Sequence, residues 1–159
     1  MSQLIIRQAE ASDCRELAEL DRVCFNVPWS LAAFEAEFKY ENEAFYVAAQ
    51  IDGQLVGYMG MRMIFDEGHI TNVAVHPGFR RRHIAKAMMS VFIAEGNARG
   101  ITSFTLEVRE SNEPAIRLYE SFGFRSAGLR RNYYPDNHED AVIMWRYEDE
   151  GRKDTDTCN

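Results

Sequence analysis

The sequence predicts a mixed α/β domain of the α+β class, with one central sheet of about seven strands flanked by about four helices. Three observations predict this class. Apolar and polar residues alternate in several short segments, as along 103–109, which is typical of strands with one buried face. Elsewhere apolar residues recur every three or four positions, as along 84–99, which is typical of amphipathic helices. Both kinds of segment follow one another within 159 residues, a length that fits one domain.

The N-terminal part is expected to contain one strand and two helices. Leu4–Gln8 is the strand. Asp13 with Glu16 signals the start of the first helix, whose apolar residues follow at helical spacing as Leu17, Leu20 and Cys24. Asn26-Val27-Pro28-Trp29 breaks that helix. Ser30 can cap a second helix, which carries Leu31, Phe34 and Phe38 on one face.

Three strands and the clearest helix are expected in the middle of the chain. Phe45–Ile51 and Leu55–Met63 flank Asp52-Gly53, a dipeptide typical of a hairpin turn. His69–Val75 is the next strand. Ile84–Arg99 is the helix, which Gly100 can end. Its apolar stripe consists of Ile84, Ala87, Met88, Val91 and Phe92.

The C-terminal part adds three strands and a helix. In Ser103–Arg109, Glu107 lies on the face opposite Phe104 and Leu106. Asn112 can cap a helix that Gly123 closes. The last two strands are expected near Phe124–Arg131 and Ala141–Tyr147. We therefore expect a single domain over residues 1–147 and a polar, disordered tail over 148–159.

Composition argues against several classes of function. A net charge of −7 does not suit general nucleic-acid binding, which needs a basic face. The first residues lack the regions of a signal peptide, and no apolar run approaches the ~20 residues that span a membrane. The odd, scattered cysteines Cys14, Cys24 and Cys158 fit reduced cytosolic thiols. A cytoplasmic protein without membrane or direct nucleic-acid partners is expected, and its oligomeric state stays open.

The most informative stretch runs from Val73 to Lys86, where a short apolar strand leads through a turn and an arginine cluster into a helix. A helix N-terminus leaves about four N–H groups without partners, and its dipole favours an anion. Basic residues normally suit the other end of a helix. The crowding of Arg80, Arg81, Arg82 and Lys86 at this helix start therefore indicates an anionic ligand such as a pyrophosphate.

This stretch resembles the acetyl-CoA-binding signature of the GNAT N-acetyltransferase superfamily, at Arg80-Arg81-Arg82-His83-Ile84-Ala85. Other blocks resemble its RimI-like branch, the ribosomal-protein N-terminal alanine acetyltransferases. These blocks are Pro28-Trp29-Ser30, the run from Leu106 to Asn112, the run from Ala115 to Phe124, the run from Arg130 to Pro135, and Glu139-Asp140-Ala141. They occur in order over about residues 4–147, so the resemblance implies the GNAT acyl-CoA N-acyltransferase fold.

The resemblance also implies an enzyme that moves the acetyl group of acetyl-CoA directly to the N-terminal α-amine of a protein. The expected partner is a ribosomal protein that starts with alanine or another small residue. An α-amine has a pKa of about 8, against about 10.4 for lysine, so a modest base suffices. Two alternatives stay open: a GNAT enzyme that acts on a small-molecule amine or lysine, and a non-catalytic CoA-binding module.

Two residues match the family's acid and base. Glu107 matches the general base, although strand alternation alone fits a solvated glutamate equally well. Such a carboxylate works near neutral pH if its surroundings raise its pKa or if a water relays the proton. Tyr119 matches the general acid that protonates the departing thiolate, and the alternative is a core aromatic.

The resemblance assigns acetyl-CoA, a co-substrate, to residues in three places. These residues are Val73, Ala74, Val75, Arg80, Arg81, Arg82, His83, Ile84, Ala85, Lys86, Asn112 and Tyr119. The strand residues act through their backbone, and Asn112 also fits a helix cap. His83 stands where the signature has its first glycine. Because residues at a helix start have ordinary φ angles, we expect His83 to have φ below zero and the loop to work.

Two loops match the family's peptide-binding side, at Phe25–Ser30 and Asn132–Pro135. Their candidate substrate residues are Pro28, Trp29, Tyr133 and Tyr134, with local packing as the alternative role. Neither loop core carries an acidic residue, which favours a small first residue over a basic one. No metal is expected, because the four histidines lack metal-ligand spacing; His69 and His76 fit surface or turn positions.

Overall fold

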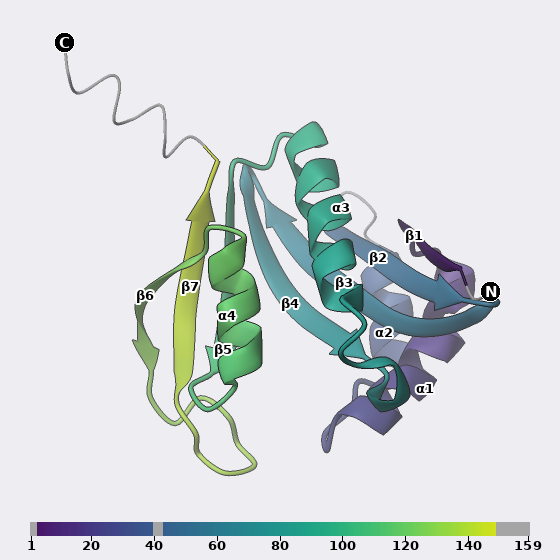
Figure 1. The fold of residues 1–159 in the computed structure, drawn as a ribbon, viewed down its shortest axis with the longest axis horizontal. Coiled ribbons are helices and arrows are strands. Elements are labelled where there is room, and N and C mark those ends of the chain that lie inside the picture. Colours follow the sequence, from purple (N-terminus) through teal and green to yellow (C-terminus); the bar gives the residue numbers. More distant parts are fainter. Residues whose placement is uncertain (1–2, 40–42, 149–159) are drawn as a thin grey trace.

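The computed structural model describes residues 3–39 and 43–148. Within them, one mixed sheet has the strand order β1-β2-β3-β4-β5-β7-β6 (Figure 1). The strands are β1 (Leu4–Gln8), β2 (Ala44–Ile51), β3 (Gln54–Ile64), β4 (Glu67–Val75), β5 (Ser103–Arg109), β6 (Arg125–Arg130) and β7 (Ala141–Tyr147). The helices are α1 (Cys14–Cys24), α2 (Leu31–Phe38), α3 (Ile84–Ala98) and α4 (Glu113–Ser121), with short 3₁₀ turns η1 (Ala11–Asp13) and η2 (Pro77–Phe79). The predicted class is confirmed.

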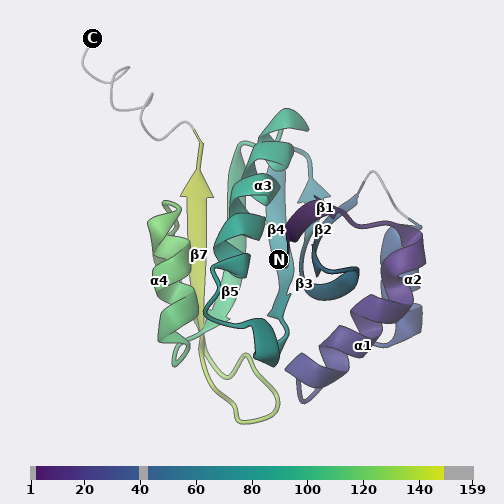
Figure 2. The ribbon, with the colours of Figure 1, turned by 45° about the vertical axis from the view of Figure 1, so that its right-hand side comes forward.

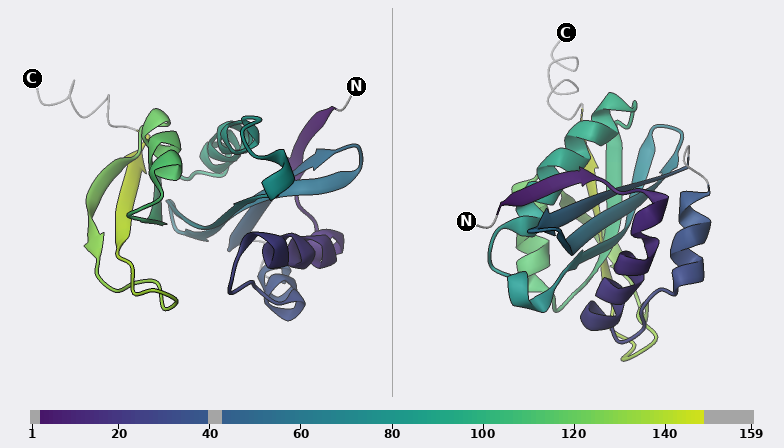
Figure 3. Two further views of the ribbon diagram at one scale, coloured as in Figure 1. Left: turned by 60° about the horizontal axis from the view of Figure 1, so that its bottom comes forward. Right: turned by 90° about the vertical axis from the view of Figure 1, so that its right-hand side faces the viewer.

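Helices cover both faces of the sheet. The α3 and α4 helices lie on one face and the α1 and α2 helices on the other (Figure 3, left). The first face buries the larger core, centred on Met88, Phe92 and Phe104. The second face buries a smaller core around Leu17 and Phe34. The sheet is therefore covered in the manner of a three-layer sandwich, and the helices bury most of the apolar stripes that the sequence shows, although Leu31 of α2 stays 37% exposed.

One pair of neighbouring strands differs from all the others in this sheet. β4 and β5 run parallel, whereas the other neighbours pair antiparallel. The crossover between β4 and β5 is α3, which packs over the sheet (Figure 2). Parallel strands need such a long connection, and α3 supplies it. Its N-terminus consequently follows directly on the end of β4 and the turn η2.

Two predicted helix caps are confirmed and one helix start works differently. Ser30 Oγ accepts from the Ala33 N–H, and Asn112 Oδ1 accepts from the Ala115 N–H. The α1 helix begins after Asp13 as predicted, but the Asp13 side chain does not cap it. Asp13 instead accepts from the backbone N–H of Glu10 and pairs with Arg7 at 2.8 Å. The ion pair with Arg7 joins β1 to the start of α1.

Strand and helix ends shift by a few residues from the prediction. Phe124, expected to open the sixth strand, is buried in the core just before β6. Gly100 and Gly123 have φ of 92° and 89°, which suits their predicted role at the ends of α3 and α4. Of the predicted polar tail over 148–159, all but the first residue lies outside the described residues.

Candidate active site

The central feature of the site is a wedge-shaped opening between β4 and β5. The two strands pair from Glu67 with Ser103 to Ile70 with Leu106, and no further pairs follow in the described chain. β4 nevertheless continues to Val75 on the β3 side. The strands diverge beyond the paired end (Figure 1). The last residues of β4 therefore present backbone N–H and C=O groups that no neighbouring strand uses on that edge.

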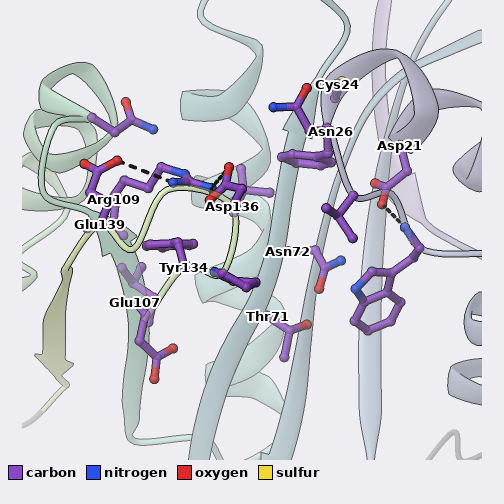
Figure 4. A pocket seen from close by; sticks show the side chains of 18 of the residues that line it. Asp21, Cys24, Asn26, Thr71, Asn72, Glu107, Arg109, Tyr134, Asp136 and Glu139 are labelled. Carbon is purple, nitrogen blue, oxygen red and sulfur yellow. Dashed lines mark hydrogen bonds and ion pairs between the residues drawn. The ribbon is translucent and has the colours of Figure 1, made fainter. Parts of the chain in front are cut away.

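A bulge in β4 marks the point where the opening begins. Gly60 pairs with Asn72 and Met61 with Ile70, so Thr71 is the extra residue on β4. Such bulges bend a strand and re-aim its side chains. Thr71 and Asn72 both line the cavity here (Figure 4).

A cavity of about 690 Å³ occupies the opening. Four parts of the chain form its walls: the segment after α1, the end of β4, strand β5 with the start of α4, and the loop between β6 and β7. Predicted site residues that line it are Trp29, Val73, Glu107, Asn112, Tyr119 and Tyr134. Ala74 and Val75 continue β4 beyond it, and Pro28, Tyr133 and the residues 80–86 do not line it.

Glu107 on β5 lies within this wall with its side chain only 10% exposed. Its Oε2 lies 2.7 Å from His69 Nε2, and its Oε1 lies 3.5 Å from Arg130 Nε. The hydrogen bond from His69 lowers the pKa of the Glu107 carboxyl, and the charge of Arg130 adds to this. A carboxylate can act as a base near neutral pH if its pKa is raised or if a water relays the proton. The first of these conditions is not met for Glu107 in this structure.

The contact of His69 with Glu107 was not predicted from the sequence. His69 lies in β4 with a side chain that is 38% exposed, which fits the expected surface position, but it also directly contacts Glu107. Strand alternation could have suggested that it shares a face with Glu107. The register of β4 against β5, which brings two residues 38 positions apart into contact, could not be read from the sequence.

Tyr119 faces the cavity from α4 and is only 7% exposed. Its ring packs against Phe124, with 5.8 Å between the ring centroids. Burial raises the pKa of the Tyr119 phenol above its usual value. The phenol consequently keeps its proton throughout the neutral range, as a proton donor must.

The loop between β6 and β7 is held over β5 by Arg109. Both terminal nitrogens of the Arg109 guanidinium take part, with Nη2 donating to Asp136 at 2.9 Å and Nη1 donating to Glu139 at 3.4 Å. The guanidinium also lies 3.9 Å from the ring centroid of Tyr134, and Figure 4 shows this cluster at the cavity wall. Hydrogen bonds from Ser111 hold the pKa of Glu139 at about 2. Burial raises the pKa of Tyr134 to about 12.

The segment after α1 is anchored by the buried carboxylate of Asp21. The Trp29 N–H donates to Asp21 Oδ2 at 2.9 Å, and the Tyr58 hydroxyl donates to Asp21 Oδ1 at 2.5 Å. Asn72 Nδ2 in turn donates to the Tyr58 oxygen at 3.1 Å. This orientation leaves Asn72 Oδ1 buried with no partner within residues 3–39 and 43–148. Burial raises the pKa of Asp21.

The start of α3 corrects the expectation for His83. Its φ is 60°, in the left-handed region, and that of Arg81 is 65°. Such angles suit glycine, which the family signature has at this position. The loop therefore keeps the glycine-like backbone although it carries a histidine. The side chain of His83, at the N-cap of α3, makes no capping hydrogen bond, in contrast to those of Ser30 at α2 and Asn112 at α4.

The basic side chains around this helix start have separate roles. Arg80 Nε donates to the Val75 carbonyl at 3.1 Å, which ties the loop to the end of β4. The Arg82 guanidinium lies over the Phe79 ring at 5.2 Å. Arg81 and Lys86 are exposed. Open backbone N–H groups surrounded by cations form a suitable site for a polyphosphate.

The family model described as the acetyltransferase (GNAT) family matches residues 14–124. The chain belongs to the acetyltransferase (GNAT) family. Its predicted fold and its class as an acetyltransferase are thereby confirmed, and members of this family use acetyl-CoA. The free edge of β4 and the uncapped start of α3 are the parts of this chain that fit such a molecule.

Relatives of this GNAT protein agree over most of its length. The ribosomal protein bS18-alanine N-acetyltransferase of Escherichia coli is 35% identical over 143 residues, covering 87% of this chain and 94% of its own. The protein of the same name from Salmonella typhimurium is 39% identical over 120 residues, covering 74% and 79%. The crystal structure of the Escherichia coli ribosomal-protein-S18-alanine N-acetyltransferase matches with a TM-score of 0.84 at 31% identity, covering 91% and 94%.

No helix in 3–39 or 43–148 is long and apolar enough to cross a membrane. Within the same ranges, no three His, Cys, Asp or Glu side chains lie close enough together to hold a metal ion.

The backbone angle of His83 leads to a testable expectation for this GNAT protein. His83→Ile is expected to raise the Kd for acetyl-CoA about tenfold, because a β-branched residue tolerates left-handed backbone less well than histidine does, by about 1 kcal/mol or more. His83→Gly is the matched control and should bind as well as the native protein. Isothermal titration with acetyl-CoA measures both. Equal affinities of the isoleucine and glycine variants would show that binding does not need φ near 60°.

Proposed function

We propose that the protein transfers the acetyl group of acetyl-CoA directly to the N-terminal α-amine of a ribosomal protein that begins with alanine or another small residue. The observation that carries this proposal is the cavity between β4 and β5. Its lining includes both the carboxylate of Glu107 and the protonated phenol of Tyr119. Two relatives that share more than a third of their aligned residues with this chain are named bS18-alanine N-acetyltransferases.

The site has a place for each part of acetyl-CoA. The amide groups of its pantetheine arm match the edge of β4 at Val73–Val75 that β5 does not pair with, which would bind them as an added strand. The pyrophosphate matches the uncapped N-terminus of α3 and the surrounding residues Arg80–Lys86. The thioester then lies in the cavity near Asn112 and Tyr119.

Acetyl transfer to an α-ammonium group moves two protons. The nitrogen loses both as the new C–N bond forms; one goes to solvent and one goes to the sulfur when the C–S bond breaks. Glu107 serves as the base for the attacking nitrogen, directly or through a water. Because the pKa of Glu107 is lowered and not raised, relay through a water is the route that we propose. Tyr119 donates the proton that the departing thiolate needs.

The peptide enters between the two loops that the resemblance assigned to it. Trp29 and Tyr134 line opposite walls of the cavity, while Pro28 and Tyr133 support these loops from outside it. Asp136 and Glu139, the acids nearest Tyr134, are already engaged by Arg109. A small uncharged first residue therefore fits this site better than a basic one.

The proposal also covers the domain organisation and the cellular location of the protein. We take residues 1–147 as one catalytic domain. Because the proposed substrate is a ribosomal protein, the reaction belongs in the cytoplasm.

A peptide panel tests the proposed function. Purified protein and acetyl-CoA are incubated with peptides that begin with Ala, Ser, Thr, Met or Glu, and with an N-terminally blocked peptide that contains lysine. Tandem mass spectrometry is expected to place the acetyl group on the α-nitrogen of the Ala and Ser peptides, with little product from the others. Acetylation of the blocked peptide alone would instead establish a lysine acetyltransferase. Bound acetyl-CoA without transfer to any peptide would contradict the proposal.

A further inference from the structure

His69 and Glu107 form a pair at the start of the opening between β4 and β5. His69 pairs with Thr105 across the two strands, and Thr105 and Glu107 share a face of β5. The side chains of His69 and Glu107 therefore lie on the same side of the sheet, with 2.7 Å between Nε2 and Oε2. The histidine is 38% exposed and the glutamate 10% exposed, so the imidazole lies on the solvent side.

The protonation of this contact follows from its chemistry. The pKa of Glu107 is lowered, so the group is a carboxylate at neutral pH and can only accept a hydrogen bond. His69 Nε2 must therefore carry the proton of the 2.7 Å bond. With Oε2 engaged in this way, Oε1, which lies 3.5 Å from Nε of the largely exposed Arg130, is the oxygen that we expect to accept the proton.

The charged groups around the pair are few. Arg130 on β6 reaches Oε1 of Glu107 at 3.5 Å and is largely exposed. Arg62 on β3 lies directly opposite His69 and is itself paired with Glu37 of α2 at 3.3 Å. The phenols of Tyr133 and Tyr134 also lie within electrostatic range of Glu107. The two arginines oppose a positive charge on His69, and Glu107 favours one.

We propose that His69 is a positioning residue for the catalytic carboxylate. Its Nε2–H fixes the rotamer of Glu107 and leaves Oε1 toward the substrate, and its charge state sets how strongly Glu107 attracts a proton. Uncharged His69 positions Glu107 and leaves it a usable base. When both ring nitrogens of His69 carry protons, its positive charge makes Glu107 a weaker base, so turnover is expected to be lower in acid. The inference rests on the proposed function, in which Glu107 is the base.

Two substitutions separate positioning from packing. His69→Gln keeps an amide N–H that can reach Glu107 but has no titratable group, whereas His69→Leu keeps volume without a donor. We expect His69→Leu to lower kcat about tenfold or more while KM for the peptide changes about twofold or less. His69→Gln should retain kcat at pH 8 within about threefold, and the acid limb of its kcat–pH profile should move to lower pH. Glu67→Gln, on the exposed start of the same strand, is the matched control.

The outcomes are distinguishable from failure of the proposed function. The inference is overturned if His69→Leu keeps native kcat, or if the acid limb of His69→Gln coincides with that of the native protein. If the leucine variant does not fold, the kcat–pH profile of His69→Gln tests the inference by itself. Failure of the proposed function would look different, since then the native protein would not acetylate peptide N-termini or Glu107→Gln would be fully active.

Discussion

Glu107→Gln is expected to lower kcat by at least about 100-fold, the usual contribution of a positioned general base. The amide has nearly the same shape and can still accept a hydrogen bond, but it cannot take a proton. The Kd for acetyl-CoA should stay unchanged, because the α3 start and the free edge of β4 are separate from Glu107. Steady-state release of CoA with an Ala-initiated peptide measures kcat, and isothermal titration measures Kd.

The matched control is Glu110→Gln, which removes an exposed carboxylate just beyond β5. It should leave both kcat and Kd near their native values. Native turnover by Glu107→Gln would remove Glu107 from the acid–base assignment and leave the identity of the base open.

The same variant should change the pH dependence of stability. A carboxyl whose pKa is lower in the folded than in the unfolded protein stabilises the fold above its unfolded pKa, and this contribution is lost as pH falls through the folded pKa. Glu107→Gln should therefore be less stable than the native protein at pH 7, and the difference should shrink in acid. Urea unfolding at pH 7 and in the acid range, where both proteins remain folded, tests the sign.

Tyr119→Phe is expected to lower kcat by about 10- to 100-fold, because the departing thiolate loses its proton donor. Phenylalanine keeps the packing against Phe124, so folding should be preserved. Because burial raises the pKa of Tyr119 above its usual value, loss of its proton should cause no alkaline fall in kcat below about pH 10. The kcat–pH profile and a thermal melt measure these effects.

Tyr147→Phe provides the control, since Tyr147 lies at the far end of β7 and half exposed. Unchanged kcat in Tyr119→Phe would assign Tyr119 to packing alone, the alternative that its position in the core already allows.

Local sequence patterns predicted most elements well. Ser103–Arg109 and Ala141–Tyr147 have the predicted bounds, because alternation reports directly on which face of a strand is buried. The caps at Ser30 and Asn112 are likewise local and were predictable from residue type. Asp13 was harder, because its partner Arg7 lies on a strand that the cap pattern does not include.

The site was less predictable, because it depends on contacts between distant residues. Alternation placed Glu107 on the face away from Phe104, but only the family resemblance distinguished it from an ordinary solvated glutamate. Its contact with His69 depends on strand register, which is set by the packing of the whole sheet. The left-handed angle of His83 was mispredicted, because the prediction gave His83 the ordinary φ of a residue at a helix start, whereas its φ is 60°.

The central claim is that the opening between β4 and β5 is the reaction site, and a crystal structure with a CoA–peptide bisubstrate analogue tests it most directly. We expect the pantetheine amides to pair with Val73–Val75, the pyrophosphate to bind at the start of α3, and the peptide nitrogen to lie between Glu107 and Tyr119. The analogue bound elsewhere, or with its peptide nitrogen remote from both side chains, would contradict this account.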